Sequence, residues 1–403
     1  MRNAFFRSLL ACYKVFVGRS RDMAIAAFKP KLATAVIGAG IGGLATAAAL
    51  RRVGVDVQVY EQASRFSRVG AGIQQSPNAM KVLRGLGLEA ALRRFAFQPS
   101  SSLSRDWKSG AITNDYPLGE RAEARFAAPY MLLHRGDLHA TLASAVPREI
   151  VHLNRRLSGL DSHNDGVSLI FADGTRVETD AVIGADGVHS VVRDFLLGPE
   201  QPRFTGRVAY RTTFPAALLA GLTIDDSAKW WGLDRHIVMY YVNRWRDEVY
   251  FVTSTPEEDF EVESWSAKGD LKLLRESYAE FHSTVRAVLA SCPDVHKWAL
   301  VERDPLPRWS EGRVVLLGDA SHPMTPYMAQ GAAAALEDAA ILSRCLERVD
   351  RDGVASAFRR FELTRKERTA RIQLTSRENT WMRETTDADW VYGYDAWHAP
   401  LAS

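Results

Sequence analysis

Three glycines near the start of the chain have a spacing that is suited to binding phosphates. Gly38, Gly40 and Gly43 fit the pattern G-x-G-x-x-G within the segment A-T-A-V-I-G-A-G-I-G-G-L. The first glycine permits a tight turn, the second lets the backbone approach a pyrophosphate, and the third lets a helix pack close to a strand. The N-terminus of that helix would add unpaired N–H groups and a partial positive charge.

The residues around these glycines predict the elements that a nucleotide-binding turn requires. An apolar run over 33–37 predicts a strand, Leu44–Arg52 favours a helix, and Val55–Tyr60 predicts a second strand that ends at Glu61. A carboxylate at Glu61 would accept hydrogen bonds from a ribose 2′-hydroxyl and would repel a 2′-phosphate. This stretch predicts a Rossmann unit for FAD or NAD and leaves the choice between them open.

Two later segments repeat the combination of a buried strand followed by an acid. D-A-V-I-G-A-D-G-V-H-S-V-V-R contains Asp186, and L-L-G-D-A-S-H-P-M-T-P-Y-M-A-Q-G-A contains Asp319, followed by Gly331 at the start of a helix-favouring stretch. An acid at the end of a strand can accept hydrogen bonds from ligand hydroxyls, and a helix N-terminus can stabilise negative charge on a bound cofactor. No second G-x-G-x-x-G is present to hold NAD permanently, which favours a bound FAD.

Together these motifs resemble the FAD-dependent aromatic hydroxylases, which are single-component flavoprotein monooxygenases. The resemblance extends from about residue 31 to about residue 396. It implies bound FAD, O2 and a transient NAD(P)H, with NADH favoured over NADPH. It also implies hydroxylation of a hydroxylated aromatic or N-heteroaromatic carboxylate through a C4a-hydroperoxyflavin, with or without decarboxylation.

The resemblance assigns FAD-binding roles by motif. The arginine of H-R-G-D-L-H matches the family's arginine near the FAD phosphates, and Asp319 of the L-L-G-D segment matches the family's ligand of the ribityl chain. The predicted cofactor-binding residues are Gly38, Gly40, Gly43, Glu61, Arg135, Asp186, Asp319, Gly331 and Ala332.

A second group of residues is predicted to hold the substrate. His236 is the candidate base, because an unperturbed imidazole titrates near neutrality, and Tyr240 is the candidate orienting residue. Without the resemblance, a histidine near two tryptophans would be taken for a core residue. The predicted lining residues are Gln74, Ser227, Tyr327 and Pro323.

Several of these positions differ from a hydroxypyridine-carboxylate member of the family. Gln74 and Tyr327 stand where that enzyme has histidines, and Ser227 stands where it has a cysteine. His236 and Tyr240 are shared with it. The pattern predicts a related but different substrate.

The wider pattern predicts an α/β fold, with a Rossmann-type FAD-binding domain and an interleaved β-sheet substrate domain. Aromatic-rich strands include a hairpin of His236–Tyr241 and Glu248–Thr253, and Leu271–Leu289 is predicted to be helical. The aromatic tail from Trp381 to Trp397 is expected to pack or to contact another subunit rather than to form a binding site. The predicted boundaries are an extension at 1–30, FAD-binding segments at 31–107, 130–203 and 303–375, substrate segments at 108–129 and 204–302, and an aromatic C-terminal segment at 376–403.

Composition narrows the class of protein further. The chain has 403 residues, 46% of them hydrophobic and 25% charged, with a net charge of +3. These values are typical of a globular protein and do not indicate a nucleic-acid partner. No segment is long and apolar enough to span a membrane. The three cysteines show no metal-binding spacing, which favours reduced thiols, no metal and a cytoplasmic location.

The alternatives that remain open are a non-decarboxylating hydroxybenzoate- or salicylate-type hydroxylase, an FAD-dependent reductase, and a flavin-binding protein without catalysis. A monomer and a homodimer are equally compatible with the sequence.

Overall fold

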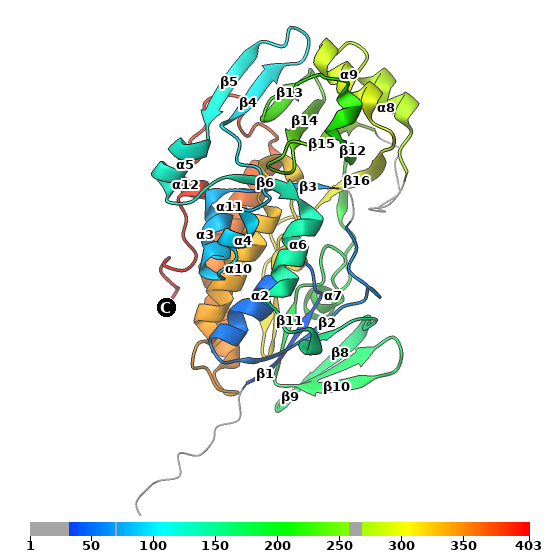
Figure 1. Ribbon diagram of the computed structural model, residues 1–403. Coiled ribbons are helices and arrows are strands. Elements are labelled where there is room, and N and C mark those ends of the chain that lie inside the picture. The colour runs from blue at the N-terminus through cyan, green and yellow to red at the C-terminus, as the bar shows by residue number, and fades with distance from the viewer. Residues whose placement is uncertain (1–31, 69–70, 258–267) are drawn as a thin grey trace, which may run out of the picture. The chain divides into compact units, whose positions relative to one another are not determined.

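A mainly parallel sheet carries the glycine turn. In the computed structural model, which describes residues 32–68, 71–257 and 268–403, this sheet has the strand order β17-β18-β11-β1-β2-β7 (Figure 1). β1 pairs in parallel with β2 and β11, as the apolar runs predicted, since strands buried on both faces read as continuous hydrophobic segments. The strands are β1 (Ala33–Ile37), β2 (Asp56–Tyr60), β7 (Val151–His152), β11 (Ala181–Gly184), β17 (Ser310–Glu311) and β18 (Val314–Leu316).

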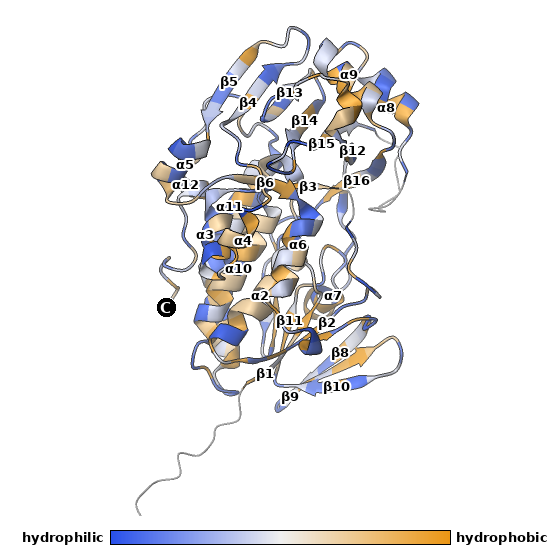
Figure 2. Cartoon of the chain, in the orientation of Figure 1, coloured by the Kyte–Doolittle hydropathy of each residue, from blue (hydrophilic) through white to orange (hydrophobic). Residues whose placement is uncertain are grey.

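Two helices with small side chains pack closely beside this sheet. α2 (Ile41–Arg52) begins directly after the glycine turn, and α10 (Gly331–Leu346) is buried along nearly its whole length. A Cβ atom at Gly42 would lie 2.9 Å from a methyl carbon of Leu317 and 3.2 Å from the Cβ of Ala335, so glycine permits this approach. Figure 2 shows both helices as mainly apolar ribbons.

A second sheet, with the order β16-β12-β15-β14-β13-β4-β5, lies apart from the first. The predicted hairpin is confirmed, because β14 pairs antiparallel with β15 and places His236 opposite Ser254. The strands are β4 (Ser101–Asp106), β5 (Ile112–Pro117), β12 (Arg203–Pro215), β13 (Ser227–Trp231), β14 (His236–Tyr241), β15 (Glu248–Pro256) and β16 (His296–Glu302).

The prediction of one helical piece over Leu271–Leu289 is wrong. The structure has two helices, α8 (Leu271–Ser277) and α9 (Ser283–Ser291). The first helix ends at Ser277, and His282 starts the second, because its ring accepts a hydrogen bond from the backbone N–H of Thr284 as the N-cap of α9.

Two smaller sheets and several helices complete the described chain. β8–β10 form the strip at the bottom of Figure 1, and β3 pairs antiparallel with β6. The remaining elements are β3 (Gly72–Gln75), β6 (Met131–His134), β8 (Leu157–His163), β9 (Gly166–Phe171), β10 (Arg176–Thr179), α3 (Pro77–Gly85), α4 (Glu89–Leu92), α5 (Gly119–Phe126), α6 (Arg135–Ser144), α7 (Val191–Leu197), α11 (Val354–Arg377), α12 (Asp389–Tyr392) and the short turns η1 (Arg148–Ile150), η2 (Ala216–Leu219), η3 (Gly318–Ala320) and η4 (Pro326–Met328).

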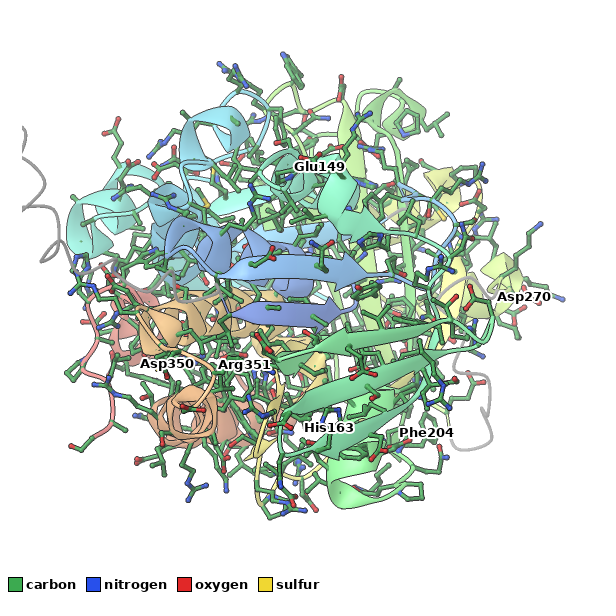
Figure 3. All side chains as sticks on the ribbon, turned by 90° about the horizontal axis from the view of Figure 1, so that it is seen from below. Glu149, His163, Phe204, Asp270, Asp350 and Arg351 are labelled. Atoms are coloured by element: carbon green, nitrogen blue, oxygen red, sulfur yellow. The ribbon has the colours of Figure 1, made fainter. Side chains whose placement is uncertain are left out.

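Asp180 ties the lower end of the parallel sheet to the turn after α10. Its carboxylate accepts the backbone N–H of Ala33 at 2.9 Å and pairs with Arg351 at 2.7 Å. Arg351 and its neighbour Asp350 are labelled in Figure 3, which looks onto this end of the molecule. This contact links the start of β1, the strand that leads into the glycine turn, to the turn after α10.

Leu32–Ser403 form one compact unit, with no division inside it that could be compared with the predicted domain boundaries. Those boundaries therefore remain a prediction. The predicted extension at 1–30 and Cys12 lie outside the described residues, whereas Cys292 and Cys345 are buried free thiols. None of the helices in the described part of the chain has both the length and the apolar character needed to cross a membrane.

Candidate active site

The three glycines of the turn have different surroundings. A Cβ on Gly38, whose φ is +99°, would lie 2.4 Å from the carbonyl oxygen of Ala185, and one on Gly43 would lie 1.9 Å from that of Gly38. Nothing lies within 4 Å of the corresponding position at Gly40. Gly38 and Gly43 are therefore required by the protein itself, and Gly40 borders open space that a phosphate group can occupy.

Glu61 holds the turn in shape from the end of β2. Its two carboxylate oxygens accept the backbone N–H groups of Ala39 at 2.8 Å and Ala63 at 2.7 Å. The ring of His139 hydrogen-bonds the carbonyl oxygen of Ala39 at 2.7 Å. The carboxylate thus stands beside the turn, and its remaining lone pairs are available to ribose hydroxyls.

The later motifs meet at the other end of the same cradle. The turn at Gly318, whose φ is +63°, places the carboxylate of Asp319 beside the first residue of α10, where a Cβ on Gly331 would lie 3.8 Å from that oxygen. The charges of Arg135 and Asp319 interact across this space. The residues present therefore fit FAD, with Gly40 and the N-terminus of α2 at the phosphates and Asp319 and the N-terminus of α10 at the ribityl chain and ring.

Asp186 is committed to the start of a helix. Its carboxylate accepts the hydroxyl of Ser190, the N-cap of α7, at 2.5 Å and the backbone N–H of Val192 in the first turn of that helix at 3.2 Å. A direct contact with FAD stays a prediction for this residue. Ala332 is the second residue of α10 and is half-buried.

A substitution at Gly40 separates a cofactor role from a folding role. Gly40→Ala adds a methyl group where no protein atom lies within 4 Å and where the backbone, with φ of −72°, suits alanine. We expect the variant to fold and to bind FAD at least about tenfold more weakly, a loss of about 1.4 kcal/mol. The measurement is FAD affinity by flavin absorbance, with Gly159→Ala on β8 as the control, since that glycine also faces open space. Unchanged FAD affinity in Gly40→Ala would remove the assignment.

A cavity of about 90 Å³ lies between the second sheet and the segment that precedes α10. Its walls come from β4, β13, β14, β15 and η4. Gln74 of β3, Tyr130 just before β6, and a group of residues near the C-terminus complete them. The lining residues are Gln74, Ser102, Ser104, Tyr130, Ser227, Lys229, His236, Val238, Val252, Thr253, Pro326, Tyr327, Met328, Ala329, Trp381, Met382 and Tyr392.

His236 begins β14 and is only 5% exposed. Its ring lies 5.3 Å from that of Trp231 and 5.5 Å, edge to face, from that of Tyr327. Within the described part of the chain, no group hydrogen-bonds its ring nitrogens. Burial, followed by the charges of Lys229 and Arg207, lowers the pKa of His236 well below 6.5, so the ring is neutral at pH 7.

Gln74 and Tyr240 form a polar pair at one end of the cavity. Gln74 Oε1 accepts the hydroxyl of Tyr130 at 2.5 Å, and the Tyr240 hydroxyl also hydrogen-bonds this glutamine. Tyr240 itself does not line the cavity, contrary to expectation, because its hydroxyl lies against the backbone of Gly72. Burial raises the pKa of Tyr240 well above 10, so the hydroxyl stays protonated.

The other predicted lining residues divide into two groups. Ser227 and Tyr327 line the cavity, and the Tyr327 hydroxyl is 3.0 Å from that of Ser254. Pro323 is misplaced by the prediction, because it is buried and its carbonyl oxygen accepts a hydrogen bond from Gln373 at 2.8 Å. Pro326, three residues later, takes its place in the wall.

Two sets of lining residues were missed. Lys229 lies on the same face of β13 as Ser227 and Trp231, so the alternation of a strand in S-A-K-W-W was a usable signal. The expectation that the C-terminal aromatic segment only packs or contacts a subunit is wrong, because Trp381, Met382 and Tyr392 line the cavity. The backbone carbonyl of Met382 accepts hydrogen bonds from Ser104 at 2.6 Å and Asn114 at 3.0 Å, which docks this segment on β4 and β5.

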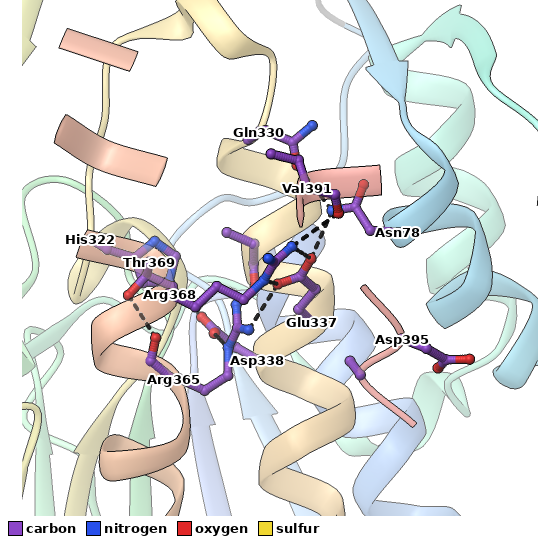
Figure 4. Close-up of polar contacts among 12 residues, drawn as sticks. Asn78, His322, Gln330, Glu337, Asp338, Arg365, Arg368, Thr369, Val391 and Asp395 are labelled. Atoms are coloured by element: carbon purple, nitrogen blue, oxygen red, sulfur yellow. Dashed lines mark hydrogen bonds and ion pairs between the residues drawn. The ribbon is translucent and has the colours of Figure 1, made fainter. Parts of the chain in front are cut away.

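A buried charged network, shown in Figure 4, fixes the N-terminal half of α10. Glu337 and Asp338 are both fully buried and pair with Arg365 of α11 at 2.8 and 2.7 Å. Asp338 also accepts the backbone N–H of Gly318 at 3.1 Å and contacts His322 at 2.6 Å. The network therefore holds the Gly318 turn and α10 together beneath the proposed flavin site.

Asn78 extends this network to α3. Its amide donates to Glu337 at 2.7 Å and to the side chain of Gln330 at 3.0 Å, and Gln330 in turn donates to Ser76 at 2.9 Å. Gln330 directly precedes α10, so its side chain links the first turn of α10 to the first turn of α3. No group of His, Cys, Asp and Glu side chains in the described ranges could hold a metal ion.

Comparison with known proteins agrees with this geometry. A family model described as an FAD binding domain matches residues 31–376. The chain is 48% identical to a 6-hydroxynicotinate 3-monooxygenase of Bordetella bronchiseptica over 93% of this chain and 97% of that protein. It is 42% identical to a 3-amino-4-hydroxybenzoate 2-monooxygenase of Streptomyces cremeus over 85% of each. A crystal structure of a Klebsiella pneumoniae HpxO variant complexed with FAD superposes with a TM-score of 0.78 and 28% identity, over 89% of this chain and 91% of that one.

Proposed function

Because this chain belongs to the FAD binding domain family and is an FAD-dependent monooxygenase of aromatic compounds, we propose that it hydroxylates a hydroxylated aromatic or N-heteroaromatic carboxylate with NAD(P)H as electron donor. NADH is kept as the favoured donor because the family resemblance implies it, and Glu61 is reserved for the ribose of the bound FAD. The overall reaction places one atom of O2 on a ring carbon and releases the other as water.

One observation carries this proposal: a single segment joins the cavity to the flavin cradle. Pro326–Ala329 line the cavity, and Gly331, two residues later, begins the helix beside Asp319. A ring bound in the cavity would therefore adjoin the place where the N-terminus of α10 meets the flavin. When bound, FAD supplies the electrons from NAD(P)H and the activated oxygen for such a reaction.

His236 is the proposed base in this cavity. A histidine that serves only the core is expected to have its ring nitrogens satisfied, whereas those of His236 have no partner among the described residues. Its lowered pKa keeps the ring neutral and able to accept the proton of a substrate hydroxyl. Proton removal would raise the electron density of the ring at the carbon that receives oxygen.

The other lining residues would orient the ring and exclude water. Tyr327 and Ser227 offer neutral hydrogen bonds, and Gln74 is held in place by Tyr130 and Tyr240. Tyr240 is thus proposed as a positioning residue that acts through Gln74. Trp381, Met382 and Tyr392 close the cavity with apolar and aromatic surface, which limits the access of water.

The test is anaerobic stopped-flow reduction of the FAD-loaded protein by NADH. The ligands are 6-hydroxynicotinate and 3-amino-4-hydroxybenzoate, which the two relatives named above act on, and 3-hydroxybenzoate, the substrate of a further relative that is a 3-hydroxybenzoate 6-hydroxylase of Klebsiella oxytoca. We expect at least one acid to accelerate bleaching of the flavin and, once O2 is admitted, to yield a hydroxylated product. Trapping of CO2 in parallel distinguishes decarboxylative hydroxylation from simple ring hydroxylation.

Two results would contradict the proposal. Consumption of NADH without a hydroxylated product for any ring acid would favour an FAD-dependent reductase. A flavin that NADH does not bleach, with or without these acids, would favour a flavin-binding protein without this catalysis.

A further inference from the structure

Lys229 places its side-chain amino group in the cavity wall without an acidic partner. Its Nζ lies 3.7 Å from the centroid of the Trp231 ring and donates a hydrogen bond of 3.4 Å to Asn379 Oδ1. Across residues 32–68, 71–257 and 268–403, no carboxylate forms an ion pair with this lysine. A charge removed from water is costly unless it is paired, so the position is suited to an anion that comes from outside the chain.

The surroundings of Lys229 add positive charge. The cavity-lining residues include no aspartate and no glutamate. Arg383, from the C-terminal segment, lies 5.5 Å from the centroid of the same Trp231 ring, and Arg207 on β12 also acts on the charge of Lys229. The local field therefore favours a negatively charged ligand group.

The position of Lys229 relative to His236 decides which group it would meet. The two residues line the same cavity from neighbouring strands, since Trp231 stands opposite His236 in the register of β13 and β14. Lys229 is two residues from Trp231 and shares its face of the strand. One monocyclic acid could therefore place its hydroxyl at His236 and its carboxylate at Lys229.

We propose that Lys229 binds the carboxylate of the ring substrate and is the residue that selects ring acids over uncharged rings of the same shape. The proposal rests on the proposed function in that it takes the cavity to hold the ring. Arg383 is not among the residues that line the cavity, and it contributes only to the positive electrostatic potential there.

The charge state of Lys229 gives the proposal a second test, which is the pH dependence of the affinity for ring acids. Burial, together with Arg383 and Arg207, lowers the pKa of Lys229 well below 10.5. The other titratable groups that face it are His236 and Tyr327, and burial keeps both neutral near pH 7. A bound carboxylate favours the ammonium form, so affinity for the acid should fall as pH rises through the pKa of Lys229 in the free protein.

The test is ligand binding to the FAD-loaded protein, followed by flavin absorbance without NADH. The matched probes are 6-hydroxynicotinate against 2-hydroxypyridine, which lacks the carboxylate, and 3-hydroxybenzoate against phenol. We expect Lys229→Met to bind the acids about 10- to 100-fold more weakly and the uncharged rings with unchanged affinity. It should also lose the fall in acid affinity at high pH. Lys229→Arg should recover part of the affinity, and Arg383→Met should retain the preference for acids.

Three outcomes would overturn the inference: equal loss of acids and uncharged rings in Lys229→Met, no loss of either, or a wild-type protein that binds both kinds of ring equally well. The measurement needs no turnover. A protein that prefers acids through Lys229 but hydroxylates none of them would refute the proposed function and leave this inference standing.

Discussion

Replacing His236 by alanine is expected to slow hydroxylation by about 10²- to 10⁴-fold, the usual contribution of a general base. Substrate affinity should change much less, because Lys229, Gln74 and Tyr327 remain in the wall. The measurements are single-turnover product formation and the Kd of the same ring acid. His236→Gln should be similarly slow, because an amide keeps the hydrogen-bonding capacity but cannot accept the proton.

The pH dependence follows from the direction of the pKa shift of His236. Because the pKa is lowered from 6.5, protonation of this residue disables it only at pH values below 6.5. The rate should therefore not fall through this group between neutral pH and 6.5.

His282 provides the control for His236. It stacks on Trp230, which faces away from the cavity, at 5.3 Å. His282→Ala should cost the cap of α9 and leave the rate of hydroxylation near that of the wild type. If His236→Ala also turned over at the wild-type rate, His236 would be only a core residue.

Replacing Asp338 by asparagine is expected to lower the free energy of unfolding by about 3–5 kcal/mol, because it leaves the buried Arg365 with half of its charge partners. The isosteric amide also weakens the contacts to Gly318 and His322. The measurement is the denaturant midpoint at saturating FAD in both proteins, since bound FAD adds stability of its own. The control is Asp389→Asn, whose ion pair with Arg125 is exposed and screened by solvent, so its denaturant midpoint should stay near that of the wild type.

Asp338 also predicts a pH dependence of stability. Burial alone would raise its pKa, but His322 and Arg365 lower it to about 2. A carboxyl whose pKa is depressed on folding stabilises the protein above the unfolded value, here 3.8, and that contribution is lost as pH falls toward about 2. Asp338→Asn should lack this part of the acid sensitivity. An equal pH dependence in both proteins, or a loss below about 1 kcal/mol, would contradict a strongly coupled network.

The flavin cradle could be predicted because its determinants are local in the sequence. Gly38, Gly40 and Gly43 lie within one strand-turn-helix unit, and the strand ending at Glu61 follows within that unit. The roles of the three glycines depend only on the backbone of the turn, so their spacing was enough to predict a phosphate-binding turn. The start of α10 at Gly331 was predicted for the same reason.

The cavity was predicted less well because its walls come from distant parts of the chain. Strand alternation gives the face of the sheet that a residue occupies, and His236 and Tyr240, four residues apart on β14, share one face. It does not say how far along that face the cavity extends, so Tyr240 was expected in the lining. Trp381 and Tyr392 reach the cavity only because the segment after α11 docks on β4, a contact between segments far apart in the sequence.

The distance along the chain between the two halves of the cradle determines when it can form during synthesis. Gly40 leaves the ribosome early, but α10 starts at Gly331, 291 positions later, and β18 joins β11 only at Val314–Leu316. Contacts of such long sequence separation slow folding and expose apolar surface in the interval. The apolar strand β1 and the alanine-rich helix α2 are therefore synthesised long before α10, the helix that packs beside them. Because FAD needs both halves of the cradle, it can stabilise only the nearly complete chain and cannot nucleate folding of the N-terminal strand and helix.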